Sequence, residues 1–511
     1  MAEKKVKSII PDVPLYGNPG KAAGTGAPKP QSQTAAKKNP SRSQTPAKKP
    51  VQRKPFADPK TGKITDIDSL IEPPPKPARE GISAATIEQA VRSSNIPMIL
   101  MIFAMLVFGL VILYSVSGPD AYGQFKDSSW FLNRQVRFTV VGIIAMLVIS
   151  FIPIDFFRKK WVALTAYFVS LGLAFATIIL GVGREHGAAR WINIGPIQLQ
   201  SSEIIKVALI VAFAGYRSVI AKLRNDGRFR PRKTKLGNQL FNAMFDFILP
   251  VGMCVLVDVV IVLQPHVSCF IIVAAVIFMC ALVSEIPGRS WLIGLAVMLA
   301  FAIVGGAVAF VVMPAEKKKS FERNYAHVFK RLQIFTADEN VDDEEEGLTK
   351  DDTRQVDNAH NALGSGGMWG VGLGNSRSKY NYVSEAQNDY IFSIYIEETG
   401  FVGGVILMLM YLVMFFMCVA VCWRAKDVFS RVIATGCTAL IFVEVLMNIS
   451  VELQVIPATG VTLPFISYGG TAQISLLIAY GLILSVSRSG TVRPEKKKSL
   501  KASKKALYPG A

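Results

Sequence analysis

Charged residues that could do chemistry gather in one glycine-rich stretch of the chain, between Gly364 and Gly404. It combines cations with several acids, namely Arg377, Lys379, Glu385, Asp389, Glu397 and Glu398. Glycine permits backbone conformations closed to other residues and lets a ligand approach closely. Glu397 and Glu398 fall inside a long apolar run, where an acid is costly and by default marks a functional site. The stretch therefore predicts a reactive centre at a membrane surface.

The composition indicates that this centre belongs to an integral membrane protein. Of the 511 residues, 51% are hydrophobic and 18% are charged, and the formal net charge is +19. The positive charge lies in the tails and in particular loops, as in membrane proteins, so we expect no nucleic-acid partner. All cysteines fall inside apolar runs and predict buried hydrophobic side chains rather than disulfides or a zinc site.

Apolar runs of about membrane-spanning length predict an all-α integral membrane protein with about ten transmembrane helices. The predicted spans are Ile96–Ser117, Val136–Ile152, Trp161–Leu180, Ser202–Ile220, Phe245–Leu263, Val267–Ser284, Trp291–Met313, Asp389–Cys422, Val432–Val451 and Ala472–Val486. A long loop, 314–388, separates the seventh and eighth spans, and loops of this length are usually functional or disordered. We expect short helices lying on the membrane before and after its acidic middle, Asp338–Asp352.

The chain divides into a basic tail (1–94), a membrane domain (95–488) and a second basic tail (489–511). The first tail is rich in Pro, Lys, Ala, Gln and Ser, and it cannot bury enough apolar surface to fold, so we expect disorder. It has no leading apolar core and is not a signal peptide. Its lysine clusters suit a docking segment, although a solvated spacer is the commoner use of such a composition.

Basic loops predict the orientation of the spans. Arg158–Lys160, Arg217–Lys235, Arg424–Lys426 and Lys496–Lys498 follow the second, fourth, eighth and tenth spans, on the same side as the basic N-terminal tail. Positive loops stay in the cytoplasm, so both termini are expected there. The long loop 314–388 is then extracellular, and Asp389 lies at the outer surface.

Three separated stretches resemble one known family. They are Arg190-Trp191-Ile192 with Gln198–Lys206, the Gly364–Gly404 stretch, and Pro457–Thr471. Their order, spacing and sidedness are similar to those of the SEDS family of bacterial shape, division and sporulation proteins (FtsW, RodA, SpoVE), and most similar to FtsW. The resemblance covers roughly Ile96 to Arg488.

The resemblance implies a ten-helix peptidoglycan glycosyltransferase that polymerises lipid II into glycan strands on the outer face of the bacterial cytoplasmic membrane. It implies a class B penicillin-binding protein as partner, together with other divisome or elongasome proteins. An FtsW-type role at the division septum is expected, and a RodA- or SpoVE-type role in elongation or sporulation is the alternative. A flippase for lipid II and a scaffold without chemistry are further alternatives, although no inverted repeat typical of transporters is found.

The family's functional residues map onto particular positions of this chain. Its essential acid falls at Asp389, its tryptophan after arginine at Trp191, and its buried acid–lysine pair at Glu203 and Lys206. The chain departs from the family in three motifs, where it has Gln200-Ser201-Ser202-Glu203 for Gln-Pro-Ser-Glu, Val383-Ser384-Glu385 for Leu-Pro-Glu, and Gln264-Pro265-His266 for Gln-Pro-Asp. The last change puts in doubt any role for an acid at position 266.

Glycosyl transfer from a diphosphate lipid requires a base and positive charge. Asp389 is the candidate general base, and its alternative role is to cap the eighth helix. The diphosphate needs cations, which arginine, lysine or a divalent ion such as Mg or Mn can supply, although the residues for a metal remain unknown. The candidate substrate-binding residues are Arg190, Trp191, Arg377, Lys379, Glu385, Ser467, Tyr468 and Gly469.

Polar residues inside the predicted spans point to internal bracing. Glu203 and Lys206 are three residues apart, so they share a helix face and can pair. We expect this pair to be a structural brace, with direct catalysis by Glu203 as the alternative. Glu444 is expected inside the bundle, and it shares the ninth span with Asn448 and Glu452.

Overall fold

The computed structural model describes an all-helical membrane fold with one small β-hairpin. The described residues are 95–181, 190–195, 197–228, 234–264, 266–314, 318, 325–326, 329–335, 350–380, 383 and 386–489. The predicted tail 1–94 and almost all of the predicted tail 489–511 lie outside this range. So do Glu385 and most of the acidic segment Asp338–Asp352.

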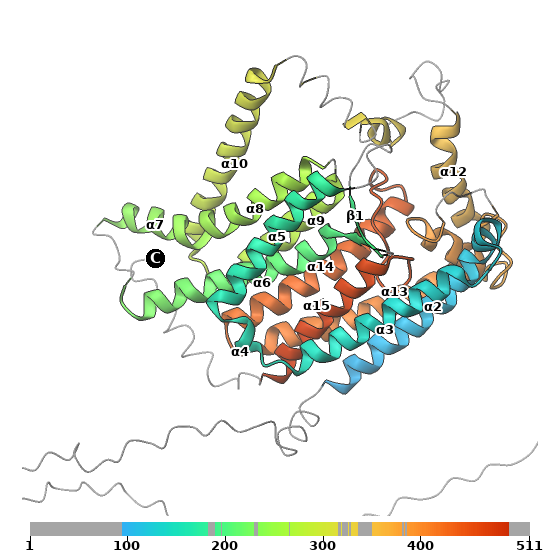
Figure 1. Ribbon diagram of the computed structural model, residues 1–511, viewed down its shortest axis with the longest axis horizontal. Helices are drawn as coiled ribbons and strands as arrows, with labels where there is room; N and C mark the ends of the chain where they lie inside the picture. The colour runs from blue at the N-terminus through green and yellow to red at the C-terminus, as the bar shows by residue number, and fades with distance from the viewer. Residues whose placement is uncertain are drawn as a thin grey trace, which may run out of the picture. The chain divides into compact units, whose positions relative to one another are not determined.

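Ten apolar helical segments make up the described bundle (Figure 1). They are α2 (Ile96–Phe125), α3 (Trp130–Phe151), α5 (Lys160–Leu180), α6 (Ser201–Asn225), α7 to α8 (Lys235–Val262), α9 (Val267–Val283), α10 (Gly288–Val312), α13 (Ile391–Arg424), α14 (Val428–Glu452) and α15 (Gly470–Arg488). Among the described residues, nine of these are long and apolar enough to cross a membrane, and α9, with 17 residues, is a shorter apolar helix. They coincide with the predicted spans, so the prediction of about ten is confirmed.

Several helices differ from their predicted bounds for local physical reasons. The fifth span begins early because the amphipathic α7 (Lys235–Ala243) runs through a π-helical turn, η3 (Met244–Ile248), into α8 (Leu249–Val262). Helix α2 continues beyond its predicted end at Ser117 to Phe125. The short helices α4 (Ile154–Phe157) and α12 (Lys350–Ser365) lie between spans, and α12 follows the acidic segment of the long loop.

A two-stranded antiparallel hairpin, which the sequence analysis did not predict, precedes α6. Strands β1 (Trp191–Ile194) and β2 (Ile197–Gln200) pair Trp191 with Gln200. The turn contains Gly195 at φ +58°, in the left-handed region that glycine adopts without strain. The hairpin leads directly into α6, so it fixes the entry of that helix.

Helix α14 lies inside the bundle and packs against α6, α9, α13 and α15 (Figure 1). Most of its central segment is buried, and its side chains therefore reach several other helices. In contrast, α10 diverges from the neighbouring helices in Figure 1 and packs mainly on α7 and η3. Its outer face is apolar, as expected for a helix surrounded by lipid.

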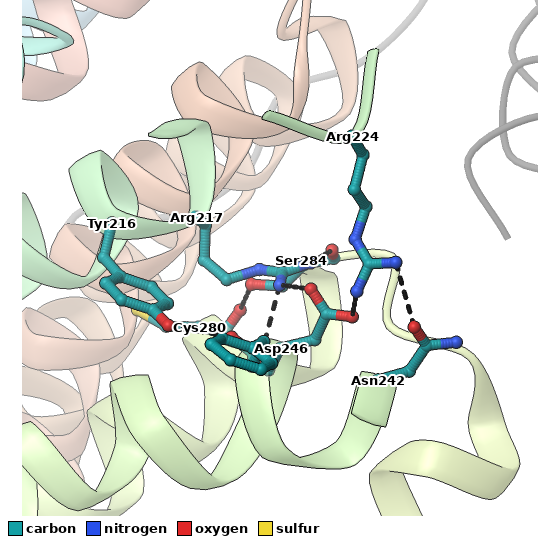
Figure 2. A network of polar contacts seen from close by, with 8 residues as sticks. Tyr216, Arg217, Arg224, Asn242, Asp246, Cys280 and Ser284 are labelled. Carbon is teal, nitrogen blue, oxygen red and sulfur yellow. Dashed lines mark hydrogen bonds and ion pairs between the residues drawn. The ribbon is translucent and has the colours of Figure 1, made fainter. Parts of the chain in front are cut away.

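The π-helical turn places one acid between two arginines of α6 (Figure 2). Asp246 accepts from Arg217 and Arg224, each at 2.5 Å, and Arg224 also donates to Asn242 Oδ1 at 2.9 Å. The predicted basic loop Arg217–Lys235 thus begins inside a helix, and its first charge is neutralised rather than solvated. This network ties the end of α6 to α7 and η3.

Contacts between loops agree with the predicted alternation of sides. Arg158, after α3, bonds Asp427, after α13, at 2.5 Å, and both loops were predicted to be cytoplasmic. Near the other end, Gln387 Nε2 donates to Asp120 Oδ2 at 3.0 Å, which joins the last turns of α2, beyond the predicted end of the first span, to the loop before α13. Loops predicted to share a side therefore meet, whereas the assignment of one side to the cytoplasm stays a prediction from charge.

Candidate functional site

Asp389 lies in a loop immediately before α13, at the end of the bundle that holds the predicted outer loops. Its main-chain carbonyl accepts from Asn448 Nδ2 at 2.9 Å, and the same amide nitrogen donates to Val461 O at 2.9 Å. Asn448 thus joins the loop before α13 to the loop after α14. The carboxylate of Asp389 makes no capping bond to α13.

Two arginines from distant parts of the chain face this carboxylate. Arg331, in the long loop, donates from Nη1 to Ala458 O at 3.2 Å. Burial raises the pKa of Asp389 above its usual value, and the positive charges of Arg331 and Arg190 oppose that rise. Burial likewise lowers the pKa of Arg190, an effect that Arg331 adds to and Asp389 counters. One acid and two cations therefore share a single electrostatic environment.

Gly460 completes the wall opposite Asp389. Its φ is +68°, and a Cβ placed there would lie 3.3 Å from Asp389 Oδ2 and 3.8 Å from Arg331 Nη1. A larger residue would therefore be strained and would crowd the acid and the arginine. The glycine keeps this space open between the third motif and the reactive side chains.

The segment that carries Arg331 is anchored at two points. Tyr325 Oη donates to Val262 O at the end of α8, and Arg331 bonds the Pro457–Gly460 turn as described above. Ser268, near the start of α9, donates from Oγ to Thr459 O in the same turn. These contacts hold the loop segment, α8, α9 and the turn together around Asp389.

The candidate substrate-binding residues Ser467, Tyr468 and Gly469 lie in the loop before α15, and contacts of this loop hold it in place. Ser467 is buried and its Oγ accepts from Leu463 N at 2.8 Å. Tyr468 N donates to Gln387 O at 2.8 Å, which brings this loop against the one that carries Asp389. Tyr468 and Gly469 are half-buried. Contact of these three residues with a substrate stays a prediction.

Lys379, a candidate substrate-binding cation, is buried in an ion pair. Its side chain is 2% exposed, and Nζ lies 2.8 Å from Glu398 Oε1 and 3.1 Å from Ser115 O. A buried ammonium group is tolerated only with a partner, and Glu398 supplies one. Lys379 is therefore occupied in an internal ion pair away from Asp389.

Arg377 is exposed, as predicted, but no contact places it beside Asp389. Its main-chain N–H donates to Glu397 Oε1 at 3.0 Å, and Ser376 Oγ donates to Glu397 Oε2 at 2.6 Å. Glu397 and Glu398 thus bind the preceding loop. The contacts of Glu397 and Glu398 indicate a structural role for both acids. The prediction that the charged residues of the stretch form one reactive centre is corrected accordingly.

Positions along α2 relate these acids to the predicted membrane boundaries. Ser115 lies about 29 Å along the helix axis from Ile96 at 1.5 Å per residue, comparable with the ~30 Å hydrocarbon thickness. Ser115 Oγ donates to Glu398 Oε2 at 2.6 Å. The predicted orientation, in which α2 starts at the inner boundary, therefore places Glu398 near the outer one. Asp120, the partner of Gln387, lies more than one turn beyond Ser115 on α2.

Some glycines of the stretch pack closely against α13, since a Cβ at Gly366 or Gly370 would lie 2.3 or 2.2 Å from a main-chain oxygen of that helix. Helix α13 is broken at Gly400, where φ is +69°. Val371 N and Gly372 N donate to the carbonyls of Glu397 and Glu398 at 3.0 and 2.9 Å, and Phe401 N donates to Gly367 O at 2.9 Å. The break frees these backbone groups, and the glycine-rich loop satisfies them.

The predicted pairing of Glu203 with Lys206 is present and includes a third residue. Lys206 Nζ lies 2.8 Å from Glu203 Oε1 and also bonds Glu444 Oε1 on α14. The departure at position 266 places a buried histidine near this cluster. Burial, and then the charges of Arg190 and Lys206, lower the pKa of His266 well below its usual value. A neutral imidazole thus lies between the inner cluster and the outer site.

The alternative in which Asp389 caps the eighth helix is wrong. The residue at the capping position is Tyr390, which makes no side-chain cap. Glu452, at the end of α14, accepts from Phe392 N at 3.2 Å, from Ser393 N, and from Ser393 Oγ at 2.7 Å. A carboxylate from another helix therefore satisfies the N-terminus of α13.

Of the predicted site residues, the structure brings together Asp389 and Arg190, and Trp191 follows Arg190 at the start of β1. Sequence reasoning missed Arg331, because a basic residue in a long loop carries no positional signal. It also missed the contacts of Asn448 and Glu452, although their spacing from Glu444 by four and eight residues indicates one helix face. Glu385 lies outside the described residues.

A separate apolar cavity of about 820 Å³ lies between the end of α12, α13 and α14. Its lining is almost wholly aliphatic and aromatic and includes Leu363, Phe392 and Leu453. It offers no charged group and does not contribute to the polar site around Asp389.

Fold and site together define a multi-pass membrane protein with a half-buried acid between two arginines among its predicted outer loops. The chain belongs to the FtsW/RodA/SpoVE family of cell cycle proteins, whose pattern matches residues 96–491. It is similar to stage V sporulation protein E of Bacillus subtilis, with 28% identity over 78% of this chain and 97% of that protein. It is also similar to a probable peptidoglycan glycosyltransferase FtsW of Trichlorobacter lovleyi, with 30% identity over 78% of this chain and 94% of that protein.

Solved structures share the fold. A chain of a peptidoglycan synthase complex, described as coordinating polymerization and crosslinking, aligns with a TM-score of 0.54 and 22% identity over 78% of this chain and 98% of its own. The rod shape determining protein RodA of Thermus thermophilus aligns with a TM-score of 0.51 and 23% identity over 78% and 98%. The arrangement of membrane helices is thus that of the RodA fold.

Proposed function

We propose that this protein is a peptidoglycan glycosyltransferase that polymerises lipid II on the outer face of the bacterial cytoplasmic membrane. The observation that carries the proposal is the half-buried Asp389 between Arg190 and Arg331, at the end of the bundle that holds the outer loops. The chain's family and the names of its FtsW relatives support the same activity.

Each group has a defined role in the proposed reaction. Asp389 accepts the proton of the acceptor sugar hydroxyl, and the hydroxyl oxygen attacks the anomeric carbon of the donor sugar. The bond from that carbon to the diphosphate breaks, and the lipid diphosphate leaves with the electron pair. Arg190 and Arg331 stabilise the charge that develops on it, and guanidinium groups suit phosphate oxygens geometrically.

The raised pKa of Asp389 favours its role as a base. A carboxylate held by helix N–H groups has a lowered pKa and is a weak proton acceptor. Here burial raises the pKa, and the capping of α13 falls to Glu452 instead. The two arginines keep the carboxylate charged and ready to accept a proton.

The same residues do not form an evident binding site for a divalent cation. Among the described residues, no cluster of three or more His, Cys, Asp or Glu side chains is found that could hold a metal ion. Around Asp389 lie the guanidinium groups of Arg190 and Arg331, which suit the oxygens of a diphosphate. The proposed steps therefore use the chain's own residues.

We place the protein with both termini in the cytoplasm, at the division septum, beside a class B penicillin-binding protein and other divisome proteins. The basic loops support the orientation, and the similar chain from a peptidoglycan synthase complex supports a partner that crosslinks the product. The similarity to a sporulation protein favours a SpoVE-type role as the second candidate. Fluorescent fusions imaged through division and sporulation separate the two roles.

Polymerisation of labelled lipid II by the purified protein tests the activity, with and without a penicillin-binding partner. Asp389→Asn should abolish glycan strands on a gel, because the amide cannot accept the proton. Asp127→Asn is the matched control, because Asp127 is an exposed acid on the same predicted side whose carboxylate accepts from the neighbouring Ser129. Strands formed by Asp389→Asn at the normal rate would overturn the proposal.

A further inference from the structure

One face of α14 carries three polar side chains, and two of them contact the segment around Asp389. Glu444, Asn448 and Glu452 are spaced by four residues and so lie along one side of the helix. Glu444 bonds Lys206 on α6, Asn448 bonds the carbonyl of Asp389, and Glu452 bonds the first residues of α13. All three side chains are buried, so water does not compete for these contacts.

Glu452 caps the N-terminus of α13, a role that Asp389 would otherwise be placed to fill. The first N–H groups of an α-helix have no partner within the helix, and an anion there is also favoured by the helix dipole. Asp389 precedes the first helical residue, Ile391, by two positions, so its carboxylate is the nearest acidic group on the local chain. Glu452 occupies these N–H groups from across the bundle instead.

We infer that Glu452 is a positioning residue for Asp389, because it caps α13 in place of the catalytic acid and leaves that acid free to face Arg190 and Arg331. Asn448 assists by fixing the main chain of Asp389 through its carbonyl. The inference rests on the proposed function, since it assigns Glu452 a role only if Asp389 is the base. It explains why an acid lies at the end of a membrane helix without a cation beside it.

The groups that face Asp389 define what a change at Glu452 would do. They are Arg190 before β1, Arg331 in the long loop, Glu452 on α14 and the adjacent Tyr390. Burial, and then the charge of Asp389, raise the pKa of Tyr390 to about 12, so its phenol stays neutral. Loss of Glu452 leaves the first N–H groups of α13 without their acceptor.

Without Glu452, the carboxylate of Asp389 is free to turn toward the N–H groups of α13. Hydrogen bonds to a carboxylate lower its pKa. The acid limb of the rate–pH profile should therefore move to lower pH, while the maximal rate falls because the base is weaker and misplaced.

The test compares polymerisation of labelled lipid II by Glu452→Ala, Glu452→Gln and the unchanged protein between pH 4 and pH 9. For Glu452→Ala we expect kcat to fall about 10- to 100-fold and the acid limb to move down by about one pH unit. KM for lipid II should stay within about threefold, because the arginines are untouched. Glu452→Gln keeps one acceptor oxygen, so it should fold well and show a smaller change in the same direction.

Asp427→Ala is the control for the loss of a helix cap away from Asp389, and it also removes the ion pair with Arg158. Asp427 caps the other end of α14, accepting from Ser430 N at 2.9 Å, and it lies in a loop remote from Asp389. This variant should lose stability without any shift of the acid limb. Rates are divided by the folded fraction, measured by size-exclusion chromatography with fluorescence detection.

The outcomes separate the inference from the function on which it rests. An unmoved acid limb in both Glu452 variants, with rates that follow the folded fraction as in Asp427→Ala, would overturn the positioning role. An Asp389→Asn protein that still polymerises lipid II would instead overturn Asp389 as the base. A shifted limb with lowered kcat, in a protein that Asp389→Asn inactivates, supports both.

Discussion

Removal of the charge of Lys206 should destabilise the protein far more than removal of its neighbour Glu203. The side chain of Lys206 is 4% exposed and lies between two carboxylates, those of Glu203 and Glu444. Pairing of Glu203 with Lys206 alone would have left Lys206 stranded in Glu203→Ala. The structure changes that expectation, because Glu444 remains as a partner when Glu203 is lost.

The expected magnitudes follow from what each variant leaves buried. Lys206→Met leaves two carboxylates without a cation, and breaking a buried pair in this way costs about 3–5 kcal/mol. Glu203→Gln keeps the hydrogen-bonding atom and the Lys206–Glu444 pair, so the cost should be about 1 kcal/mol, as for one ordinary hydrogen bond. Neutralising all three residues, as Glu203→Gln, Lys206→Met and Glu444→Gln together, should recover most of the loss.

Thermal unfolding in detergent measures these differences. At about 2 °C per kcal/mol, Lys206→Met should lower Tm by about 6–10 °C and Glu203→Gln by about 2 °C. Lipid II polymerisation measured on the same samples separates a brace from a catalytic group. A brace predicts that the triple variant regains activity along with stability, whereas a catalytic Glu203 predicts a stable and inactive protein.

Two results would refute this reasoning. Equal losses of Tm in Lys206→Met and Glu203→Gln would show that Glu444 does not share the lysine. A triple variant as unstable as Lys206→Met would show that shape rather than charge holds the cluster together.

The remaining predictions concern the outer site and the tails. Polymerisation should fall as the pH is lowered, with a midpoint above the usual range of an aspartate, because burial raises the pKa of Asp389 and only its deprotonated form accepts a proton; an acid limb near pH 4 would contradict this. Lys379→Met should lower Tm by several degrees, because it leaves Glu398 buried and unpaired. Arg377→Ala changes an exposed side chain and should shift Tm by less than about 1 °C. Equal changes of Tm in the two variants would refute the internal ion pair. Deletion of residues 1–94 should leave polymerisation by purified protein unchanged while weakening localisation, and a folded but inactive truncation would show that the tail belongs to the catalytic machinery.

Much of the fold could be predicted from the sequence because a membrane restricts the choice of structure. A chain in lipid must satisfy its backbone hydrogen bonds within each helix, so apolar runs of sufficient length define the spans directly. The alternation of basic loops then predicts the orientation of the spans. Contacts such as Arg158–Asp427 join loops that were predicted to lie on the same side. The motif alone predicts that Asp389 is the essential acid.

Pairings between distant segments could not be predicted in the same way. The stretch Gly364–Gly404 is continuous in sequence, and its charges were predicted to form one centre. The break of α13 at Gly400 instead draws Lys379 to Glu398, while Asp389 turns toward another part of the bundle. Local spacing does not reveal which buried acid a lysine will meet.

The sequence by itself determined the membrane helices, their order and the acid at the head of the eighth one, because hydropathy and motif spacing are local properties of the chain. The tertiary structure alone decided which cations face that acid and which acid caps its helix. Arg331 arrives from a long loop and Glu452 from the end of another helix. A buried charge needs a partner, and which partner it meets depends on how the helices pack. The pairing therefore cannot be read from any single segment of the sequence.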